Sequence, residues 1–234
     1  MNTILYWLTQ NLSDVPEDSE WLAEAERAVE AGLRFAKRRD DWRLGRWTAK
    51  QAVCAYLGKS GSCFPYLEIR SAADGAPEVF YENDPAGFSI SISHCRRTGL
   101  CVASGQDMLV GCDVEIIEAR ENGFILDYFT AGEIEAYEQV PPEKKILASN
   151  LVWSAKESVL KILRDGLRRD TRSVEIRVDV SVEQQQWNGW SGRCRESSRT
   201  FWGWWKASEG LVYTMASGLP TSVPEQLIRV KGMR

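Results

Sequence analysis

The chain alternates twice between a helical pattern and a strand pattern, and this order constrains the fold more than any other feature. Residues 17–57 carry the apolar spacing and charge of helices, whereas residues 64–117 consist of short alternating or apolar runs separated by Gly, Pro, Asp and Asn. The helical pattern returns at residues 130–164, and strand patterns resume after residue 172. Helices followed by strands are typical of α+β folds. The sequence therefore predicts two similar α+β halves.

We expect these halves to be residues 1–118 and residues 119–234. The runs GLCVASG (99–105) and GLVYTMASG (210–218) resemble one another near the ends of the two strand-rich regions, which is consistent with an internal duplication. The chain has 234 residues, 44% of them hydrophobic, so it can bury a large core in one domain or in two smaller ones. Two similar halves within one chain favour a monomer.

Composition argues against several classes of function. The 33 acidic residues outnumber the 29 basic ones, so a broad nucleic-acid-binding surface is not expected. Six scattered cysteines, without a CxxC pair and with one histidine, argue against a structural zinc site and suit reduced core thiols. The first residues do not resemble a secretion signal, and no apolar run is long enough to span a membrane. The expected location is the cytoplasm.

The stretch LVGCDVEII (109–117) is predicted to be a buried strand that carries two carboxylates. Asp113 and Glu115 point to one side of this strand because side chains alternate along it. Their charges, roughly 6 to 7 Å apart beside low-dielectric walls, repel each other. A cation, a raised pKa on one carboxyl or exposure to water at a sheet edge could compensate. A solvated polar face is the simplest of these alternatives.

The stretch WSAKESVLK (153–161) is predicted to be helical, with Trp153, Glu157 and Lys161 on one stripe. Taken alone, Glu157 and Lys161 would be an ordinary surface ion pair. Added to the strand carboxylates, however, Glu157 completes an all-oxygen site for a hard cation such as Mg²⁺, which takes further ligands from substrate phosphates. Lys156 and Lys161 beside that site would meet phosphate oxygens or a leaving group. The combination indicates phosphoryl transfer.

A basic stripe runs along the helix predicted around residues 34–50. Arg39, Arg43, Arg46 and Lys50 recur at intervals of four, three and four residues, which places them on one face over about three turns. A solvated charged face is one interpretation. No acidic residue interleaves on the stripe, so an anionic ligand is the other.

Four motifs together resemble the 4′-phosphopantetheinyl transferases, in particular the long single-chain, surfactin-type branch. GCDVE (111–115) and WSAKESVLK (153–161) are similar to the GxDxE and WxxKExxxK signatures of that family. SISHC (91–95) is similar to its short strand ending in Ser-His, and RRDDWRLGRWTAKQAV (38–53) resembles its arginine-rich amino-terminal helix. The motifs stand in the family's order. The last seventy or so residues are similar only in being rich in strands.

The resemblance implies a phosphopantetheinyl transferase fold, with two α+β halves packed as a pseudo-dimer, and a specific reaction. Such enzymes move the phosphopantetheine arm of coenzyme A onto a serine of an apo acyl or peptidyl carrier protein and release 3′,5′-ADP. By resemblance, Asp113, Glu115 and Glu157 would hold Mg²⁺ against the pyrophosphate. Glu157 would take the proton from the serine, and Lys161 would neutralise or protonate the departing phosphate oxygen.

The resemblance also implies contacts to coenzyme A. Ser93 and His94 would contact its phosphates, and Arg43 and Arg46 would bind its 3′-phosphate. Lys156, beside the carboxylates, is a further expected phosphate contact. Without the resemblance, His94 would be interpreted as a buried, hydrogen-bonded imidazole, because it falls on the apolar side of its strand.

Two other functions remain compatible with the same residues. One is a catalytically inactive relative that binds coenzyme A or a carrier protein. The other is a metal-dependent phosphohydrolase built on the same carboxylates. Separately, Thr130 and Glu133 are predicted to form a capping box at a helix start, which explains both residues without a catalytic role.

Overall fold

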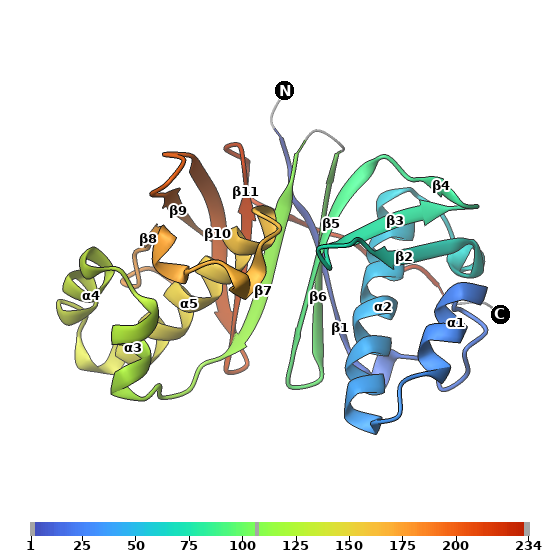
Figure 1. Cartoon of the computed structure of the whole chain (residues 1–234), viewed down its shortest axis with the longest axis horizontal. Helices are drawn as coiled ribbons and strands as arrows, with labels where there is room; N and C mark the ends of the chain where they lie inside the picture. Colours follow the sequence, from blue (N-terminus) through green and yellow to red (C-terminus); the bar gives the residue numbers. More distant parts are fainter. Residues whose placement is uncertain (1–2, 106–107, 232–234) are drawn as a thin grey trace. The chain divides into compact units, whose positions relative to one another are not determined.

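The computed structural model describes residues 3–105 and 108–231, which divide into two compact units (Figure 1). The N-terminal unit is Leu5–Leu109 together with the end of the chain, and the C-terminal unit is Val110–Pro224 together with the first residues. Both units combine helices with mainly antiparallel strands. The predicted α+β class is confirmed.

The N-terminal unit places a long helix against a sheet. Its described helices and strands are α1 (Glu24–Ala31), α2 (Ala36–Tyr56), β1 (Tyr6–Asn11), β2 (Leu67–Ser71), β3 (Pro77–Tyr81), β4 (Asp84–Pro85), β5 (Phe88–Cys95), β6 (Thr98–Gly105) and β12 (Glu225–Gln226), with 3₁₀ turns at Leu12–Asp14 and Gly61–Tyr66. One sheet has the order β12-β1-β6-β5, and β2, β3 and β4 form another. Helix α2 contacts β1, β5 and β6.

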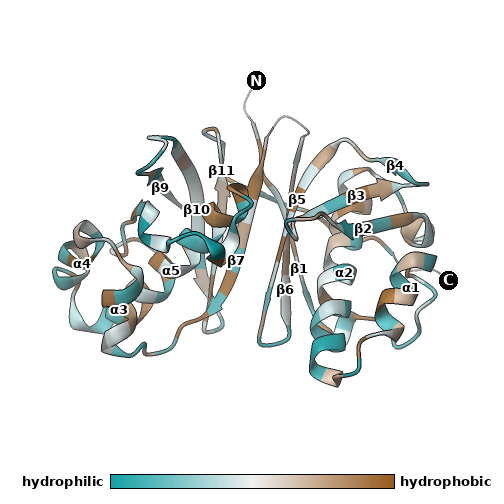
Figure 2. Cartoon of the chain, in the orientation of Figure 1, coloured by the Kyte–Doolittle hydropathy of each residue, from teal (hydrophilic) through white to brown (hydrophobic). Residues whose placement is uncertain are grey.

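Helix α2 changes character along its length. Figure 2 shows its first turns as hydrophilic, whereas its buried residues run from Leu44 to Cys54. The helix ends at Tyr56 and is capped by Leu57, and Gly58 then takes a φ of +64°, the left-handed conformation that glycine adopts without strain. The buried stretch packs into a core with Leu8 and Phe64. The basic start of α2 therefore remains available for polar contacts.

The C-terminal unit repeats this arrangement. Its described helices and strands are α3 (Asn122–Tyr128), α4 (Ala131–Glu138), α5 (Lys145–Ile162), β7 (Val110–Ile116), β8 (Val174–Arg177), β9 (Asn188–Cys194), β10 (Thr200–Ser208) and β11 (Leu211–Ser217), with 3₁₀ turns at Pro142–Lys144, Gly166–Arg168 and Thr171–Ser173. The sheet has the antiparallel order β7-β11-β10-β9-β8. Helix α5 contacts β7, β11, β8 and β10, and most of its residues are buried.

The strand with the paired carboxylates belongs to the C-terminal unit. We expected it in a half ending at residue 118, but β7 pairs with β11, where Asp113 lies opposite Thr214 and Glu115 opposite Val212. The chain therefore divides before β7 rather than after it. This partner strand lies about a hundred residues further along the chain, so the local pattern around β7 could not reveal it.

Short sequence repeats mark equivalent elements of the two units. WTAKQAV (47–53) lies in α2 and WSAKESV (153–159) in α5, while LEIR (67–70) forms β2 and VEIR (174–177) forms β8. In each unit a short helix precedes the long helix, and the strands follow. These repeats support an internal duplication more directly than the similarity of GLCVASG (99–105) to GLVYTMASG (210–218) does.

Two of the cysteines do not behave as expected. Cys54, near the end of α2, forms a disulfide with Cys63 in the 3₁₀ turn after that helix, so the prediction of reduced thiols is wrong for this pair. Cys101, Cys112 and Cys194 are buried and form no disulfide, as predicted. In the part of the chain that the structure describes, no helix combines the length and apolar character needed to cross a membrane.

Candidate active site

Helix α5 lies close to strand β7 at the glycine of the GCDVE motif. A Cβ atom at Gly111 would overlap the backbone carbonyl group of Ser158 and crowd the side chain of Ile162. The hydroxyl groups of Ser158 and Thr214 share a hydrogen bond of 2.7 Å, which ties α5 to β11 as well. The absence of a side chain at Gly111 therefore lets the strand carboxylates come close to side chains of the helix.

Replacing Gly111 with Ala should destabilise the protein by about 3 kcal/mol, because the added methyl group must displace helix backbone rather than a flexible side chain. The measurement is the free energy of unfolding in urea. The matched control is Gly189→Ala on β9, where an added Cβ meets nothing within 4 Å. Equal losses in the two variants would contradict the close packing of α5 on β7.

Asp113 and Lys161 form the most buried ion pair of this site. Asp113 is 3% exposed, and Lys161 Nζ donates to its Oδ1 at 3.0 Å and to the Cys112 carbonyl at 2.7 Å. Burial alone would lower the pKa of Lys161, but the charges of Asp113, Cys112 and Glu157 outweigh burial and raise that pKa. Lys161 is therefore held in its ammonium form, directed at β7.

Glu115 is held by two donors. Trp153 Nε1 donates to its Oε1 at 3.2 Å, and Arg120 Nη2 donates to its Oε2 at 3.2 Å. Arg120 is in turn fixed by Asn150 Oδ1 at 2.8 Å. Burial and the charge of Asp113 raise the pKa of Glu115, while Arg120 and Trp153 oppose the rise. Arg120 was missed by the sequence analysis, although it is the first basic residue after the carboxylate strand.

The charges of both strand carboxylates, Asp113 and Glu115, act on Glu157. Burial, together with the charges of Asp113 and Glu115, raises the pKa of Glu157 to about 7 against the opposing charges of Lys161 and Arg120. The structure therefore brings Asp113, Glu115, Glu157 and Lys161 of the two motifs into electrostatic contact. At neutral pH, Glu157 exchanges its proton readily.

The carboxylates suit a hard divalent cation chemically, but they do not converge on one point. Within residues 3–105 and 108–231, no three His, Cys, Asp or Glu side chains are arranged to hold a metal ion. Lys161 and Arg120 provide the positive charge beside Asp113 and Glu115 instead. The all-oxygen donor set and the raised pKa of Glu157 both fit Mg²⁺, because a cation would relieve the repulsion between the carboxylates.

Residues 109–215, which include β7 and α5, match the family model described as the 4′-phosphopantetheinyl transferase superfamily. This segment, just under half of the chain, is thus similar to members of that superfamily. The match does not distinguish the branches of the superfamily.

Curated relatives show the same similarity. The chain is 29% identical over 126 residues to the 4′-phosphopantetheinyl transferase AcpT of Salmonella typhi, which covers 53% of this chain and 58% of the relative. AcpT of Escherichia coli O157:H7 is 29% identical over 121 residues, covering 51% of this chain and 57% of the relative. The chain thus spans somewhat more than half the length of the curated relatives it matches.

Two solved structures show a weaker likeness. A holo-(acyl-carrier-protein) synthase from Bacillus anthracis, in complex with CoA (3′,5′-ADP), is 22% identical with a TM-score of 0.37, covering 44% of this chain and 96% of that one. The holo-[acyl-carrier-protein] synthase of Thermotoga maritima is 20% identical with a TM-score of 0.37, covering 56% and 76%. Both scores are too low to bear on function.

Lys156 lies apart from the three carboxylates Asp113, Glu115 and Glu157. Its side chain is fully buried, pairs with Glu133 at 2.8 Å and donates to the carbonyl oxygens of Thr171 and Val174. The prediction that Lys156 contacts a phosphate is wrong, because successive residues of a helix point in different directions. Lys156 faces α4 and β8, whereas Glu157 faces β7.

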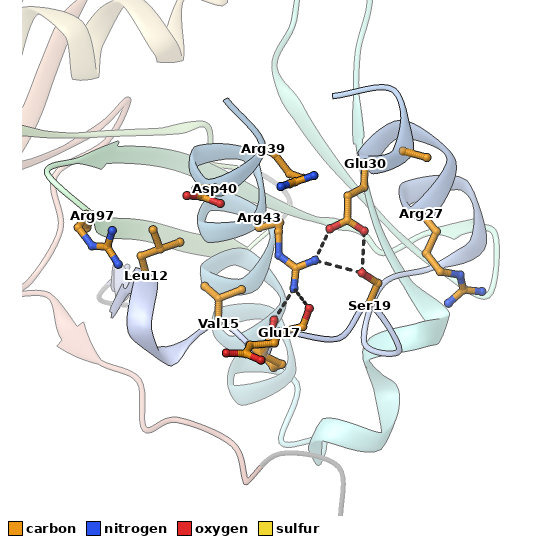
Figure 3. A pocket seen from close by; sticks show the side chains of 12 residues that line it. Leu12, Val15, Glu17, Ser19, Arg27, Glu30, Arg39, Asp40, Arg43 and Arg97 are labelled. Atoms are coloured by element: carbon orange, nitrogen blue, oxygen red, sulfur yellow. Dashed lines mark hydrogen bonds and ion pairs between the residues drawn. The ribbon is translucent and has the colours of Figure 1, made fainter. Parts of the chain in front are cut away.

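The basic stripe of α2 meets acidic residues that the sequence analysis did not consider. Arg43 pairs with Glu30 of α1, donates to Ser19 Oγ at 3.1 Å and donates to the carbonyl oxygen of Asp18 at 2.7 Å (Figure 3). Arg46 Nε lies 3.9 Å from Glu26 Oε1. Acidic residues of α1, a separate helix that precedes α2 in the chain, thus offset the charge of the stripe beyond Arg39.

Burial distinguishes Arg46 and Lys50 from the other residues of the stripe. Burial lowers the pKa of Arg46, against the opposing charge of Glu26. The Arg46 guanidinium lies 5.1 Å from the centre of the Trp42 ring. Lys50 is fully buried and pairs with Glu26 at 2.5 Å. Lys50 is therefore a core residue of the N-terminal unit rather than a ligand contact.

A cavity of about 620 Å³ lies in the N-terminal unit beside Arg43. Figure 3 shows Arg39 and Arg97 lining it as well, and neither side chain bonds to another described residue. Asp40 and Glu17 also line this cavity, so its charge is mixed. Arg39 and Arg97, rather than Arg43, are the lining cations left for an anion.

Ser93 and His94 lie near the end of strand β5 in the N-terminal unit. Ser93 is buried and His94 is exposed, so the interpretation of His94 as a buried core imidazole is wrong. The pleat places His94 opposite Gly99 of β6, and its ring lies 4.0 Å from the position that a Cβ on Gly45 would take. The imidazole is therefore accessible beside α2.

Proposed function

We propose that this protein transfers the 4′-phosphopantetheine arm of coenzyme A to a serine of an apo acyl or peptidyl carrier protein, in a Mg²⁺-dependent reaction that releases 3′,5′-ADP. The observation that supports this most is the grouping of Asp113, Glu115, Glu157 and Lys161 on β7 and α5, inside the segment that matches the superfamily.

In this proposal each acidic residue has a defined role. Asp113, Glu115 and Glu157 hold Mg²⁺, which when bound neutralises charge on the pyrophosphate of coenzyme A. Glu157 also accepts the proton of the carrier serine as a general base. Trp153 and Arg120 fix the orientation of the Glu115 carboxylate.

The proposed reaction exchanges one phosphorus–oxygen bond for another. The serine oxygen forms a bond to the phosphorus that carries the pantetheine arm, and the bond from that phosphorus to the oxygen of the second phosphate breaks. The serine proton goes to Glu157, and the leaving 3′,5′-ADP takes the electron pair. Asp113 keeps the Lys161 ammonium protonated, and this positive charge stabilises the departing oxygen.

The family resemblance assigns further phosphate contacts of coenzyme A to residues of the N-terminal unit. The family resemblance assigns Ser93 and His94 to its phosphates, and the exposure of His94 is compatible with that role. It assigns the 3′-phosphate to Arg43, which is already bonded to Glu30, and to Arg46, which lies 3.9 Å from Glu26. In our proposal these two arginines shape the region rather than carry the phosphate alone.

Intact-mass analysis distinguishes this proposal from the alternatives. The protein is incubated with coenzyme A, Mg²⁺ and an apo carrier protein. A carrier mass gain equal to one phosphopantetheine group supports transfer. Nucleotide release without carrier labelling would indicate a phosphohydrolase, and neither product would indicate an inactive binding relative. The complete set of Asp113, Glu115, Glu157 and Lys161 argues against the inactive relative.

A further inference from the structure

Each unit contains one buried lysine–glutamate pair among its described residues. In the C-terminal unit, Lys156 Nζ lies 2.8 Å from Glu133 Oε2, with side chains 0% and 1% exposed. In the N-terminal unit, Lys50 Nζ lies 2.5 Å from Glu26 Oε2, with side chains 0% and 3% exposed. Buried charges of this kind are tolerated when they are fully paired.

The two glutamates make the same bonds. Each is the third residue of a short helix and accepts the N–H of the residue before that helix, and the capping box predicted for Thr130 and Glu133 is confirmed. Each also accepts a strand N–H through its other oxygen. The donors are Thr130 at 2.7 Å and Ile176 at 2.7 Å for Glu133, and Ala23 at 3.0 Å and Ile69 at 3.0 Å for Glu26.

The two lysines are equally engaged. Besides its glutamate, each ammonium donates to two backbone carbonyl oxygens. The acceptors are Thr171 and Val174 for Lys156, and Trp21 and Phe64 for Lys50. An ammonium group has three protons, so three acceptors satisfy it. Neither lysine has a donor left for a ligand.

The residue after the lysine differs between the units. Glu157 comes after Lys156, whereas Gln51 comes after Lys50, and Gln51 Oε1 accepts the backbone N–H of Val230 at 2.9 Å. The buried pair is thus common to both units, while the acidic residue occurs in one of them. The buried pair therefore has a structural role at the long helix of each unit. The proposed chemistry depends on the residue that follows the lysine, which is Glu157 in the C-terminal unit.

We propose that Lys156 and Glu133 are positioning residues that fix the rotation of α5 about its axis. Consecutive residues of a helix are separated by about 100° because a turn contains 3.6 residues. Three bonds from Lys156, to α4, to the 3₁₀ turn at Thr171–Ser173 and to β8, therefore determine the direction in which Glu157 points. The same rotation directs the Trp153 indole to Glu115 Oε1, 3.2 Å away.

The Trp153 indole provides a test that does not depend on the proposed function. In Lys156→Met, the indole ¹H–¹⁵N resonance of Trp153 should shift, because its bond to Glu115 is lost. The matched control is Lys50→Met, which removes an equally buried ammonium from the N-terminal unit. The control should lose thermal stability to a similar extent while the Trp153 resonance stays in place.

The kinetic part of the test rests on the proposed function. In Lys156→Met, kcat should fall by about 100-fold while the KM for coenzyme A changes little, because misplacing a reacting group by about 1 Å has this effect. Lys50→Met should leave kcat unchanged. If the wild-type protein transfers nothing, the proposed function fails, and the Trp153 resonance still decides the positioning role.

A second variant removes the risk that an unpaired buried charge prevents folding. Lys156→Met combined with Glu133→Gln removes both charges and keeps an amide oxygen as an acceptor. We expect a folded protein with a shifted Trp153 resonance and a reduced kcat. A folded double variant with the wild-type resonance and wild-type kcat would overturn the proposal, as would equal shifts of Trp153 in Lys156→Met and Lys50→Met.

Discussion

Glu157→Gln should reduce kcat by about 100- to 10,000-fold, the range associated with the loss of a general base. Glutamine keeps the shape of the side chain but removes the charge that would hold Mg²⁺ and accept the serine proton. The contacts proposed for coenzyme A in the N-terminal unit are untouched, so the Kd for coenzyme A measured by calorimetry should change little. Turnover and Kd together separate loss of chemistry from loss of binding.

The matched control for this variant is Glu118→Gln. Glu118 is an exposed carboxylate just after β7, and its side chain makes no bond to another described residue. Its replacement removes one negative charge near the site without touching the acidic group. The contradicting result concerns Glu157→Gln. If its turnover lies within about twofold of wild type, the acidic residues are dispensable and the proposed chemistry would have to be abandoned.

The stability of the metal-free protein should fall as pH rises through about 7. The pKa of Glu157 is raised from 4.5 to about 7 in the folded state, so the folded state binds this proton more tightly than the unfolded chain does. The resulting stabilisation is complete below pH 4.5 and is lost above the folded pKa. Its size is on the order of 3 kcal/mol, from the free energy equivalent of a pKa difference.

Urea unfolding of the wild type and of Glu157→Gln at pH 5 and pH 8.5 measures this effect. The difference between the two proteins cancels groups that titrate in both. Glu157→Gln should gain stability relative to the wild type at pH 8.5, and Mg²⁺ should stabilise the wild type more than the variant. A difference that does not vary with pH would contradict the raised pKa of Glu157 in the folded state.

The local part of the site was predictable from sequence. Strand alternation alone places Asp113 and Glu115 on one side of β7, and Thr130 and Glu133 form the capping box that their spacing predicts. Proximity of Glu157 to the strand carboxylates required the family resemblance. Nothing local in the sequence indicates that α5 packs on β7, which depends on the long-range approach at Gly111.

The errors have physical causes as well. Helix α5 is buried on nearly all sides, so its apolar pattern cannot show that Lys156 and Glu157 face different neighbours. Arg43 was considered with α2 alone, whereas its acidic partner Glu30 lies on α1. The repeat of WTAKQAV in WSAKESV was visible in the sequence, and it would have indicated that Lys156 has a structural counterpart in Lys50.

The most direct test of the account is the position of a bound cation. Crystals of the wild-type protein soaked with Mn²⁺ and coenzyme A would be analysed for anomalous scattering. We predict one peak with oxygen atoms of Asp113, Glu115 and Glu157 as ligands, at about 2.0–2.2 Å as expected for a small octahedral cation. A peak bound elsewhere, with these carboxylates directed away from it, would contradict the proposed metal site.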